Sequence, residues 1–166
     1  YKIGVTKLGI SEKLSLSGPR SFYGSTKLSA EILIQEYSEF YGIKASIIRF
    51  GVIAGPRQMG KIDQGVATLW IAKHYWKKEL KYIGFNGSGK QVRDILHIND
   101  AVDLIDLQIH NIELFNNKIF NAGGGLSNSL SLLEMTMICE DITGNKIKIN
   151  SEKENRSADM RIYITD

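Results

Sequence analysis

The stretch from Ser21 to Phe50, SFYGSTKLSAEILIQEYSEFYGIKASIIRF, predicts a helix followed at once by a buried strand. Its apolar residues recur at helical spacings of three and four, at Leu28, Ile32, Leu33, Tyr37, Phe40 and Tyr41. Gly42 is placed to end the helix, because glycine readily adopts the left-handed backbone that follows many helix C-termini. The β-branched run from Lys44 to Phe50 is typical of a buried strand. A helix leading directly into such a strand favours an α/β fold.

Helical and strand-like segments alternate along the rest of the chain. The residues before Ser21 and those from Gly51 to Gly65 are expected to be loops. Further helices are expected at 66–78, 101–110 and 131–144, and further strands at 80–85, 91–98, 118–121, 146–149 and 162–164. Asn99 is the expected N-cap of the helix at 101–110, and Ser131 with Glu134 forms a capping-box sequence.

Composition excludes several classes of protein. The 166 residues are 43% hydrophobic and 23% charged, which is enough apolar surface for one folded domain or a large fragment. The net charge of +3 comes from scattered basic residues, without the stripe that nucleic-acid binding requires. No apolar run approaches the roughly 18 residues of a membrane span, and no signal segment opens the chain. The single cysteine, Cys139, excludes an intramolecular disulfide and indicates a reducing compartment, the cytoplasm.

Tyr23 and Lys27 stand four residues apart at the start of the first helix, in the sequence YGSTK. Side chains four apart lie on one helix face, so a phenol and an ammonium can share one site. A neighbouring cation stabilises phenolate, which can accept a proton from a sugar hydroxyl while hydride leaves the carbon. The spacing alone also fits an ordinary helix surface. The buried strand and the Gly55-Pro56 loop that follow favour the catalytic hypothesis.

Other possible sites are weaker. The sequence GFNGSGKQ from Gly84 to Gln91 is one residue short of a phosphate-binding P-loop, but Gln91 offers no hydroxyl to Mg²⁺ and the next residues alternate like a strand. A hairpin turn is expected there instead. His74, His97 and His110 have no second His or Cys at ligand spacing, so no metal site is expected. The sequence contains no G-x-S-x-G motif, which argues against a serine hydrolase.

Motifs along almost the whole chain resemble those of the extended short-chain dehydrogenase/reductases, the NAD-dependent epimerase/dehydratase family. The matching segments, in order, are Tyr23–Lys27 (Y-x-x-x-K), Arg49–Arg57 (RFGVIAGPR), Gln91–His97 (QVRDILH), Phe120–Gly125 (FNAGGG) and Arg156–Asp159 (R-x-x-D). The resemblance implies a Rossmann-like parallel-sheet domain joined to a smaller, mixed α/β substrate-binding domain. It also implies NAD as cofactor and a nucleotide sugar as substrate.

The resemblance implies roles for individual residues. Tyr23 would be the catalytic acid and base, and Lys27 would tune it and hold the cofactor ribose. Val52 and Ile53 would line the nicotinamide pocket, although a plain core strand explains these two residues equally well. Arg93 and Arg156 would grip the diphosphate, which suits guanidinium groups. Gln64 and Tyr82 would lie near the base and the sugar.

Two parts of the family pattern are absent from the sequence. There is no glycine-rich dinucleotide fingerprint after an N-terminal strand, and no catalytic Ser or Thr well before Tyr23. The chain is therefore expected to be the C-terminal half of an enzyme and inactive alone. Residues 1–55 would complete the NAD-binding domain. Residues 56–166 would form most of the substrate-binding domain, with segments crossing between the two.

The expected reaction is epimerisation of a sugar carbon by transient oxidation and re-reduction. Residues Gly55–Gly60, Asp63–Gly65 and Gly89–Gln91 most resemble the CDP-paratose 2-epimerase (CDP-tyvelose epimerase) subfamily, which implies a CDP-deoxyhexose substrate. Two alternatives remain open: a nucleotide-sugar dehydratase or reductase of the same fold, and a fragment that dimerises without chemistry. The resemblance implies a homodimer through the helix that begins near Tyr23.

Overall fold

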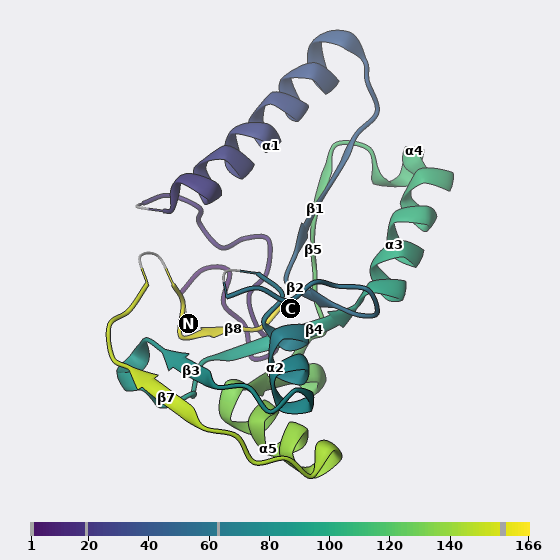
Figure 1. Ribbon diagram of the computed structural model, residues 1–166. Helices are drawn as coiled ribbons and strands as arrows, with labels where there is room; N and C mark the ends of the chain where they lie inside the picture. The colour runs from purple at the N-terminus through teal and green to yellow at the C-terminus, as the bar shows by residue number, and fades with distance from the viewer. Residues whose placement is uncertain (1, 19, 63, 157–158) are drawn as a thin grey trace.

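The computed structural model describes residues 2–18, 20–62, 64–156 and 159–166 (Figure 1). Asp63 of the subfamily pattern and the two central residues of the Arg156–Asp159 motif lie outside these ranges. The helices are α1 (Phe22–Tyr41), α2 (Val66–Tyr75), α3 (Ile98–His110), α4 (Ile112–Phe115) and α5 (Leu132–Thr143). The strands are β1 (Ser46–Phe50), β2 (Val52–Ala54), β3 (Leu80–Ile83), β4 (Val92–His97), β5 (Lys118–Ala122), β6 (Ser129–Ser131), β7 (Ile149–Glu152) and β8 (Ile162–Tyr163). The α/β class expected from the alternating pattern is confirmed.

Helix α1 forms where the sequence predicts it. The Ser21 side chain accepts a hydrogen bond from the Gly24 N–H at 3.1 Å, which caps the helix N-terminus. Gly42 ends the helix in the left-handed conformation, with φ of 65°. The helix then leads through a short loop into β1, as the opening sequence indicates.

Three separate groups of strands carry the fold. Strands β1 and β5 pair in parallel, with Ile48 opposite Phe120. Strand β4 is the centre of the largest group, because β2 and β8 pair with it in parallel and β6 pairs with it antiparallel. Strands β3 and β7 form a third parallel pair.

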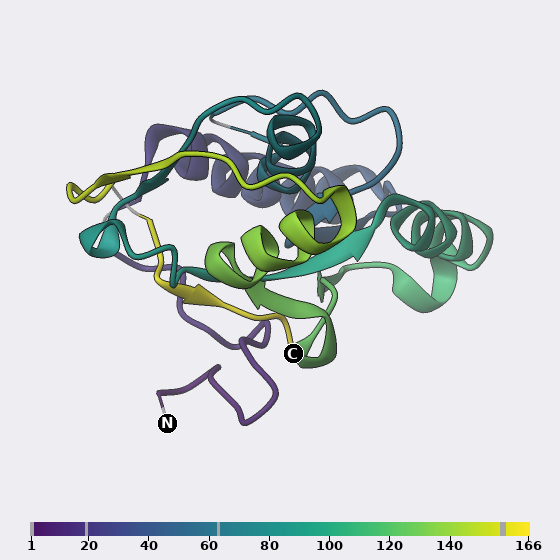
Figure 2. The same cartoon turned by 60° about the horizontal axis from the view of Figure 1, so that its bottom comes forward.

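Strand β8 brings the end of the sequence back to the middle of the fold. In Figure 2 the yellow C-terminal strand runs beside β4, and the purple N-terminal segment lies below it. Ile10 bridges to Thr165, and the Ile10 N–H donates to the Ile164 carbonyl at 2.7 Å. The segment around Ile10 and the end of the chain therefore pack against each other.

The buried core lies between α2, α5 and the strands they cover. Trp70 and Ala67 of α2 pack with Met135 and Cys139 of α5 and with Leu80 of β3. Burial raises the pKa of the Cys139 thiol, which suits its expected role as a small core residue.

Three local expectations are wrong. The turn after β3 is not a β3–β4 hairpin, because β3 pairs with β7 and the Gly87 carbonyl accepts a hydrogen bond from the Ser151 hydroxyl of β7. Asn99 is not an N-cap, because β4 runs directly into α3 and His97 caps it by accepting the Asn99 N–H. The expected loop after Gly51 contains strand β2, which the periodicity of only a few residues could not reveal.

Candidate functional site

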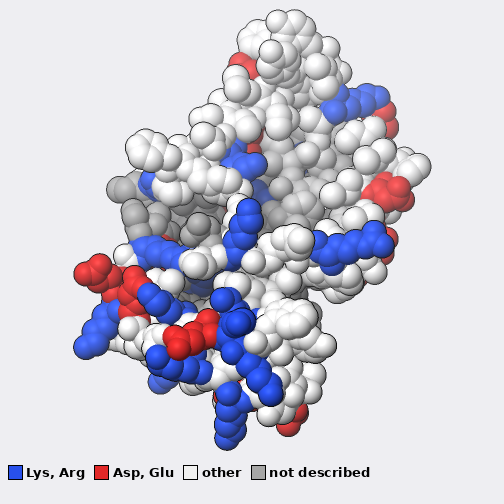
Figure 3. All heavy atoms as spheres, in the orientation of Figure 1, with Lys and Arg blue, Asp and Glu red and all other residues white. Residues whose placement is uncertain are grey.

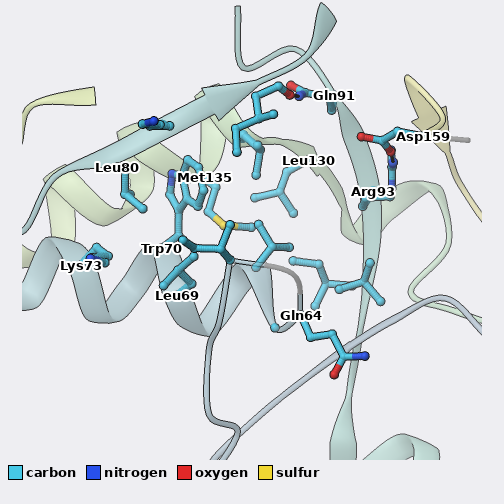
Figure 4. Close-up of a pocket in the computed structure, with 18 of the residues that line it drawn as sticks. Gln64, Leu69, Trp70, Lys73, Leu80, Gln91, Arg93, Leu130, Met135 and Asp159 are labelled. Carbon is cyan, nitrogen blue, oxygen red and sulfur yellow. Dashed lines mark hydrogen bonds and ion pairs between the residues drawn. The ribbon is translucent and has the colours of Figure 1, made fainter. Parts of the chain in front are cut away.

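A cavity of about 530 Å³ opens between α2, α5 and strands β3 and β4 (Figure 4). Its floor is apolar and includes Trp70, Leu130 and Met135. Charged side chains stand toward its edges, with Lys73 on one side and Arg93 with Asp159 on the other. Lys and Arg side chains gather over the same lobe in the space-filling view (Figure 3). An apolar cavity with a few charged groups at its edge is the usual form of a small-molecule site.

The structure brings five of the sequence-predicted site residues together around this cavity. These residues are Val52, Ile53, Gln64, Arg93 and Arg156. They come from segments far apart in the sequence: strand β2, the loop before α2, strand β4 and the segment before β8. Pairing of β4 with both β2 and β8 is what draws the strands of this group together.

Tyr82, the remaining residue predicted to bind substrate, is not among the described residues that line the cavity. Its ring stacks on Trp70 with centroids 5.9 Å apart, and its hydroxyl lies 2.7 Å from Thr136 Oγ1. Trp70 Nε1 donates to the same Thr136 oxygen at 2.9 Å, so Tyr82 belongs to a polar junction inside the core. Burial raises the pKa of Tyr82, with the Thr136 hydrogen bond acting in the opposite direction.

Arg93 is held by the segment that precedes β8. Its Nη2 lies 2.8 Å from Asp159 Oδ1 and donates to the Met160 carbonyl at 2.6 Å. Its Nη1 donates to the carbonyls of Val92 and Arg161, at 2.8 and 3.5 Å. The Arg93 and Asp159 side chains are each about three-quarters buried, with exposed fractions of 26% and 27%.

Arg156 and Gln64 also line the cavity. Arg156 is exposed, and its Nη2 donates to the Ile62 carbonyl at 3.3 Å. This bond joins the loop before α2 to the segment before β8. Gln64 is exposed and belongs to the same loop.

Tyr23 and Lys27 lie together on α1, as their spacing predicts. Lys27 Nζ is 5.5 Å from the centroid of the Tyr23 ring, and Tyr23 is 64% exposed. The first turn of α1 is the end of the helix nearer the lobe of β3, β7 and β8 (Figure 1). Neither residue is among the described residues that line the cavity.

An ion pair fixes α1 against β1. Arg49 Nη2 lies 2.6 Å from Glu31 Oε2, and Arg49 Nε lies 2.9 Å from Glu31 Oε1. This bidentate hydrogen bonding from Glu31 raises the pKa of Arg49. The Ser38 hydroxyl also hydrogen-bonds to Asn117, so α1 is attached at its middle and near its end.

Sequence reasoning missed several residues of the cavity. Lys73 lies on α2, and Asp159 was matched only as part of a motif, with no contact assigned to it. Gln91 is 92% buried at the cavity wall, since 8% of its surface is exposed, and its Nε2 donates to the Ile83 carbonyl at 2.5 Å. A lysine on an otherwise apolar helix was the one available signal for Lys73.

The near-P-loop does not have P-loop geometry. Residues Phe85–Gly87 form a short 3-10 turn, and strand β4 follows where a P-loop would open a helix. Within the described ranges, no three His, Cys, Asp or Glu side chains group as metal ligands. No helix in the described part of the chain is both long and apolar enough to cross a bilayer.

Comparison with known proteins relates the chain to a group of sugar-nucleotide enzymes. Residues 5–123 match the profile of the NAD dependent epimerase/dehydratase family. CDP-paratose 2-epimerase of Salmonella typhi is 31% identical over 146 residues, which are 87% of this chain and 43% of that protein. UDP-glucuronate 4-epimerase of Thermodesulfobacterium geofontis is 32% identical over 93% of this chain and 45% of its own length.

A solved structure agrees with these relatives. UDP-glucuronic acid 4-epimerase from Bacillus cereus, in complex with UDP-glucuronic acid and NAD, superposes with a TM-score of 0.81 at 26% identity. The match covers 99% of this chain and 49% of that one, so the chain spans about half the length of its relatives. The sequence motifs, the fold and these matches agree that the chain belongs to the NAD-dependent epimerase/dehydratase family.

Proposed function

We propose that this chain is part of an NAD-dependent nucleotide-sugar epimerase, that it carries the substrate-binding cavity, and that the substrate is a CDP-deoxyhexose. The cavity carries the proposal, because it combines an apolar floor with the guanidinium groups of Arg93 and Arg156 at its edge. Guanidinium groups suit a diphosphate, and the enclosed apolar space suits a base or a deoxygenated sugar. The separate β1–β5 pair supports a division into residues 1–55 and 56–166, with β5 crossing back to the first part and β2 crossing to the second by pairing with β4.

The residues of this half fit the nicotinamide end of NAD. Val52 and Ile53 offer apolar surface at the cavity wall, and the Lys27 ammonium lies beside the Tyr23 phenol. Lys27 would hold the cofactor ribose through its ammonium. When bound, NAD supplies reversible hydride acceptance, so that hydride removed from one face of a sugar carbon can return to the other.

Tyr23 and Lys27 would manage the proton. The Tyr23 oxygen accepts the proton of the sugar hydroxyl as the carbon becomes planar, and later returns it to the same oxygen. The Lys27 ammonium, 5.5 Å from the centroid of the Tyr23 ring, would place a positive charge beside the oxygen that exchanges the proton. The exposure of Tyr23 leaves its hydroxyl open to a substrate.

Sequence similarity supports the choice of a CDP-sugar. The Salmonella typhi relative is a CDP-paratose 2-epimerase, and the segments around Gly55–Gly65 and Gly89–Gln91 follow the pattern of that subfamily. Other relatives are UDP-sugar epimerases, so nucleotide choice is the point to test. The buried Cys139 thiol supports a reducing compartment, the cytoplasm.

We also propose that α1 forms a homodimer interface. The helix exposes Ile32, Leu33, Tyr37, Phe40 and Tyr41, and the face of α1 seen in Figure 3 carries few charges. An exposed apolar face of this extent is typical of an interaction surface. Sedimentation of the isolated chain at high concentration should show a dimer, and a monomer alone would contradict this interface.

Calorimetry with the isolated chain tests the substrate proposal. CDP-glucose should bind more tightly than UDP-glucose. Arg93→Gln should weaken the binding of CDP-glucose about tenfold or more, because it removes charged hydrogen bonds to the ligand. Lys118→Gln is the matched control, since Lys118 is exposed and donates to the Leu114 carbonyl away from the cavity. Equal binding by the Arg93→Gln variant would show that the cavity is not the diphosphate site.

The isolated chain should neither bind NAD at micromolar concentration nor turn substrate over. Nicotinamide absorbance and binding heat, measured with the chain and NAD, test this expectation. Micromolar binding would contradict it.

A further inference from the structure

We propose that Asp159 is an internal competitor for Arg93, and that a diphosphate binds by exchanging with this carboxylate. The inference rests on the proposed function, because it assigns a second role to the same diphosphate site. Its consequence is selection for ligands that carry more negative charge than the single carboxylate they displace.

The hydrogen bonds of Arg93 are the first observation. Nη1 and Nη2 together make four hydrogen bonds, to Asp159, Met160, Val92 and Arg161. Each of these nitrogens carries two hydrogens, so both are fully used, and within the described residues only Nε has no acceptor. A phosphate can therefore meet this guanidinium in a bidentate way only after one of the present acceptors leaves.

The burial of the pair is the second observation. The side chains of Arg93 and Asp159 are only 26% and 27% exposed, although the backbone around Asp159 is open to solvent, so water screens their attraction less than it screens a fully exposed pair. Both residues line the cavity, and Figure 4 shows them facing each other at one edge of it. The carboxylate thus occupies the position from which an anion in the cavity would reach Arg93.

Of the four acceptors of Arg93, Asp159 is the one that can move away, because the backbone that follows it is held by strand pairing. The Val92 N–H donates to the Arg161 carbonyl at 2.9 Å, and β8 continues from there along β4. On the other face of β4, the buried Asp94 carboxylate accepts the Thr165 N–H at 3.1 Å and the Gly125 N–H at 3.0 Å. Backbone pairing holds Arg161 to Thr165 in place, whereas Asp159 and Met160 lie before the paired residues. Met160 accepts through its backbone carbonyl, whereas Asp159 accepts through a side chain, which can rotate away without moving the backbone.

The charge of a ligand then determines whether it can displace the Asp159 carboxylate from Arg93. A phosphodiester with one negative charge replaces the Asp159 carboxylate charge for charge and gains little. A nucleoside diphosphate sugar carries two negative charges, and Arg156 at the same opening can pair with the second. The Arg93–Asp159 pair therefore favours diphosphates over singly charged or neutral ligands.

Calorimetry with CDP as the probe, on the isolated chain, tests the exchange. Asp159→Asn should tighten CDP binding about two- to fivefold, the range that a partly exposed ion pair is worth. Cytidine, which lacks phosphate, should bind the variant and the original chain equally. Asp141→Asn on α5 makes the same change of charge at an exposed residue outside the cavity lining and should leave CDP binding unchanged.

A double-mutant cycle separates direct exchange from a general change of charge. In an Arg93→Gln background, Asp159→Asn should no longer tighten CDP binding, because the guanidinium for which Asp159 and the phosphates compete is absent. Equal CDP affinity for the original chain and Asp159→Asn would overturn the exchange while leaving the proposed function intact. An equal gain with and without Arg93, or an equal gain for cytidine, would also overturn the exchange. Failure of both proteins to bind CDP would overturn the exchange together with the proposed diphosphate site.

Discussion

Glu31 of α1 and Arg49 of β1 form a bidentate ion pair with exposed side-chain fractions of only 16% and 21%. The pair joins the helix that carries Tyr23 and Lys27 to the strand that leads to Val52 and Ile53. The position of the proposed catalytic pair thus depends on an interaction that neither residue makes itself.

Glu31→Gln should lower the free energy of unfolding by about 1–3 kcal/mol, because it leaves a largely buried guanidinium without its counter-charge. Urea denaturation followed by circular dichroism measures the change. Glu113→Gln is the matched control, since it removes the same charge from the exposed pair with Lys44 and should cost less than about 1 kcal/mol. Equal losses in both variants would contradict the special role of the Glu31–Arg49 pair.

Glu134 should make stability depend on pH in the acidic range. Hydrogen bonds from the Ser131 hydroxyl and N–H lower the pKa of the Glu134 carboxyl below its ordinary value of 4.5. A lowered folded-state pKa stabilises the protein above the unfolded value, and this contribution is lost as pH falls through the folded value. The stability difference between the original chain and Glu134→Gln should therefore be largest near neutral pH and shrink below about pH 4.5.

Urea midpoints measured from neutral pH down to acidic pH test this expectation. Ser131→Ala is an informative companion, because it removes the hydroxyl that caps α5 and should itself cost about 1 kcal/mol. A stability difference for Glu134→Gln that does not change with pH would contradict the assignment.

Gly123→Ala should destabilise the protein by about 1–3 kcal/mol through overpacking. A Cβ at Gly123 would overlap both the carboxylate of Asp94 on β4 and the side chain of Thr165 just after β8, and both residues are buried. Gly24→Ala is the control, since its Cβ would approach nothing closer than 3.4 Å and alanine favours a helix. Thermal unfolding of the two variants should move in opposite directions, and a neutral Gly123→Ala would contradict the close packing.

In an enzyme that joins this chain to a cofactor-binding half, as proposed above, Tyr23→Phe should lower kcat by about a hundredfold or more, because it removes the group that exchanges the proton. The affinity for CDP-glucose should stay within about twofold, since Tyr23 is absent from the described lining of the cavity. Turnover followed by NMR of the sugar, together with calorimetry, separates the two quantities. A Tyr23→Phe variant that keeps full turnover would exclude Tyr23 as the acid and base.

Local signals allowed some of this structure to be predicted from the sequence. Ser21 and Gly42 mark the ends of α1, and Ser131 with Glu134 marks the start of α5, because caps depend on residues close by. The clustering of Arg93 and Arg156 around one cavity followed from family motifs, not from any local pattern.

Pairing between distant segments could not be predicted. Nothing in the sequence of β3 indicates that it pairs with Ile149–Glu152, nor does β4 indicate that residues near 162 lie beside it. The contact of Arg93 with Asp159 depends on that second pairing. Both residues belong to motifs recognised in the sequence, but their contact could not be predicted from it. Tyr82 shows the same limit, because its partner Thr136 is 54 residues away.

The pairing of β4 with β8 also has a consequence for biosynthesis. Asp94 and the Thr165 amide that it binds are 71 residues apart, so a ribosome makes strand β4 long before strand β8, which pairs with it. Until then Asp94 has neither the Thr165 N–H nor the cover that β8 provides. A nascent chain that has been made only as far as α5 therefore lacks Arg156 and Asp159 at the cavity, as well as strand β8 beside β4.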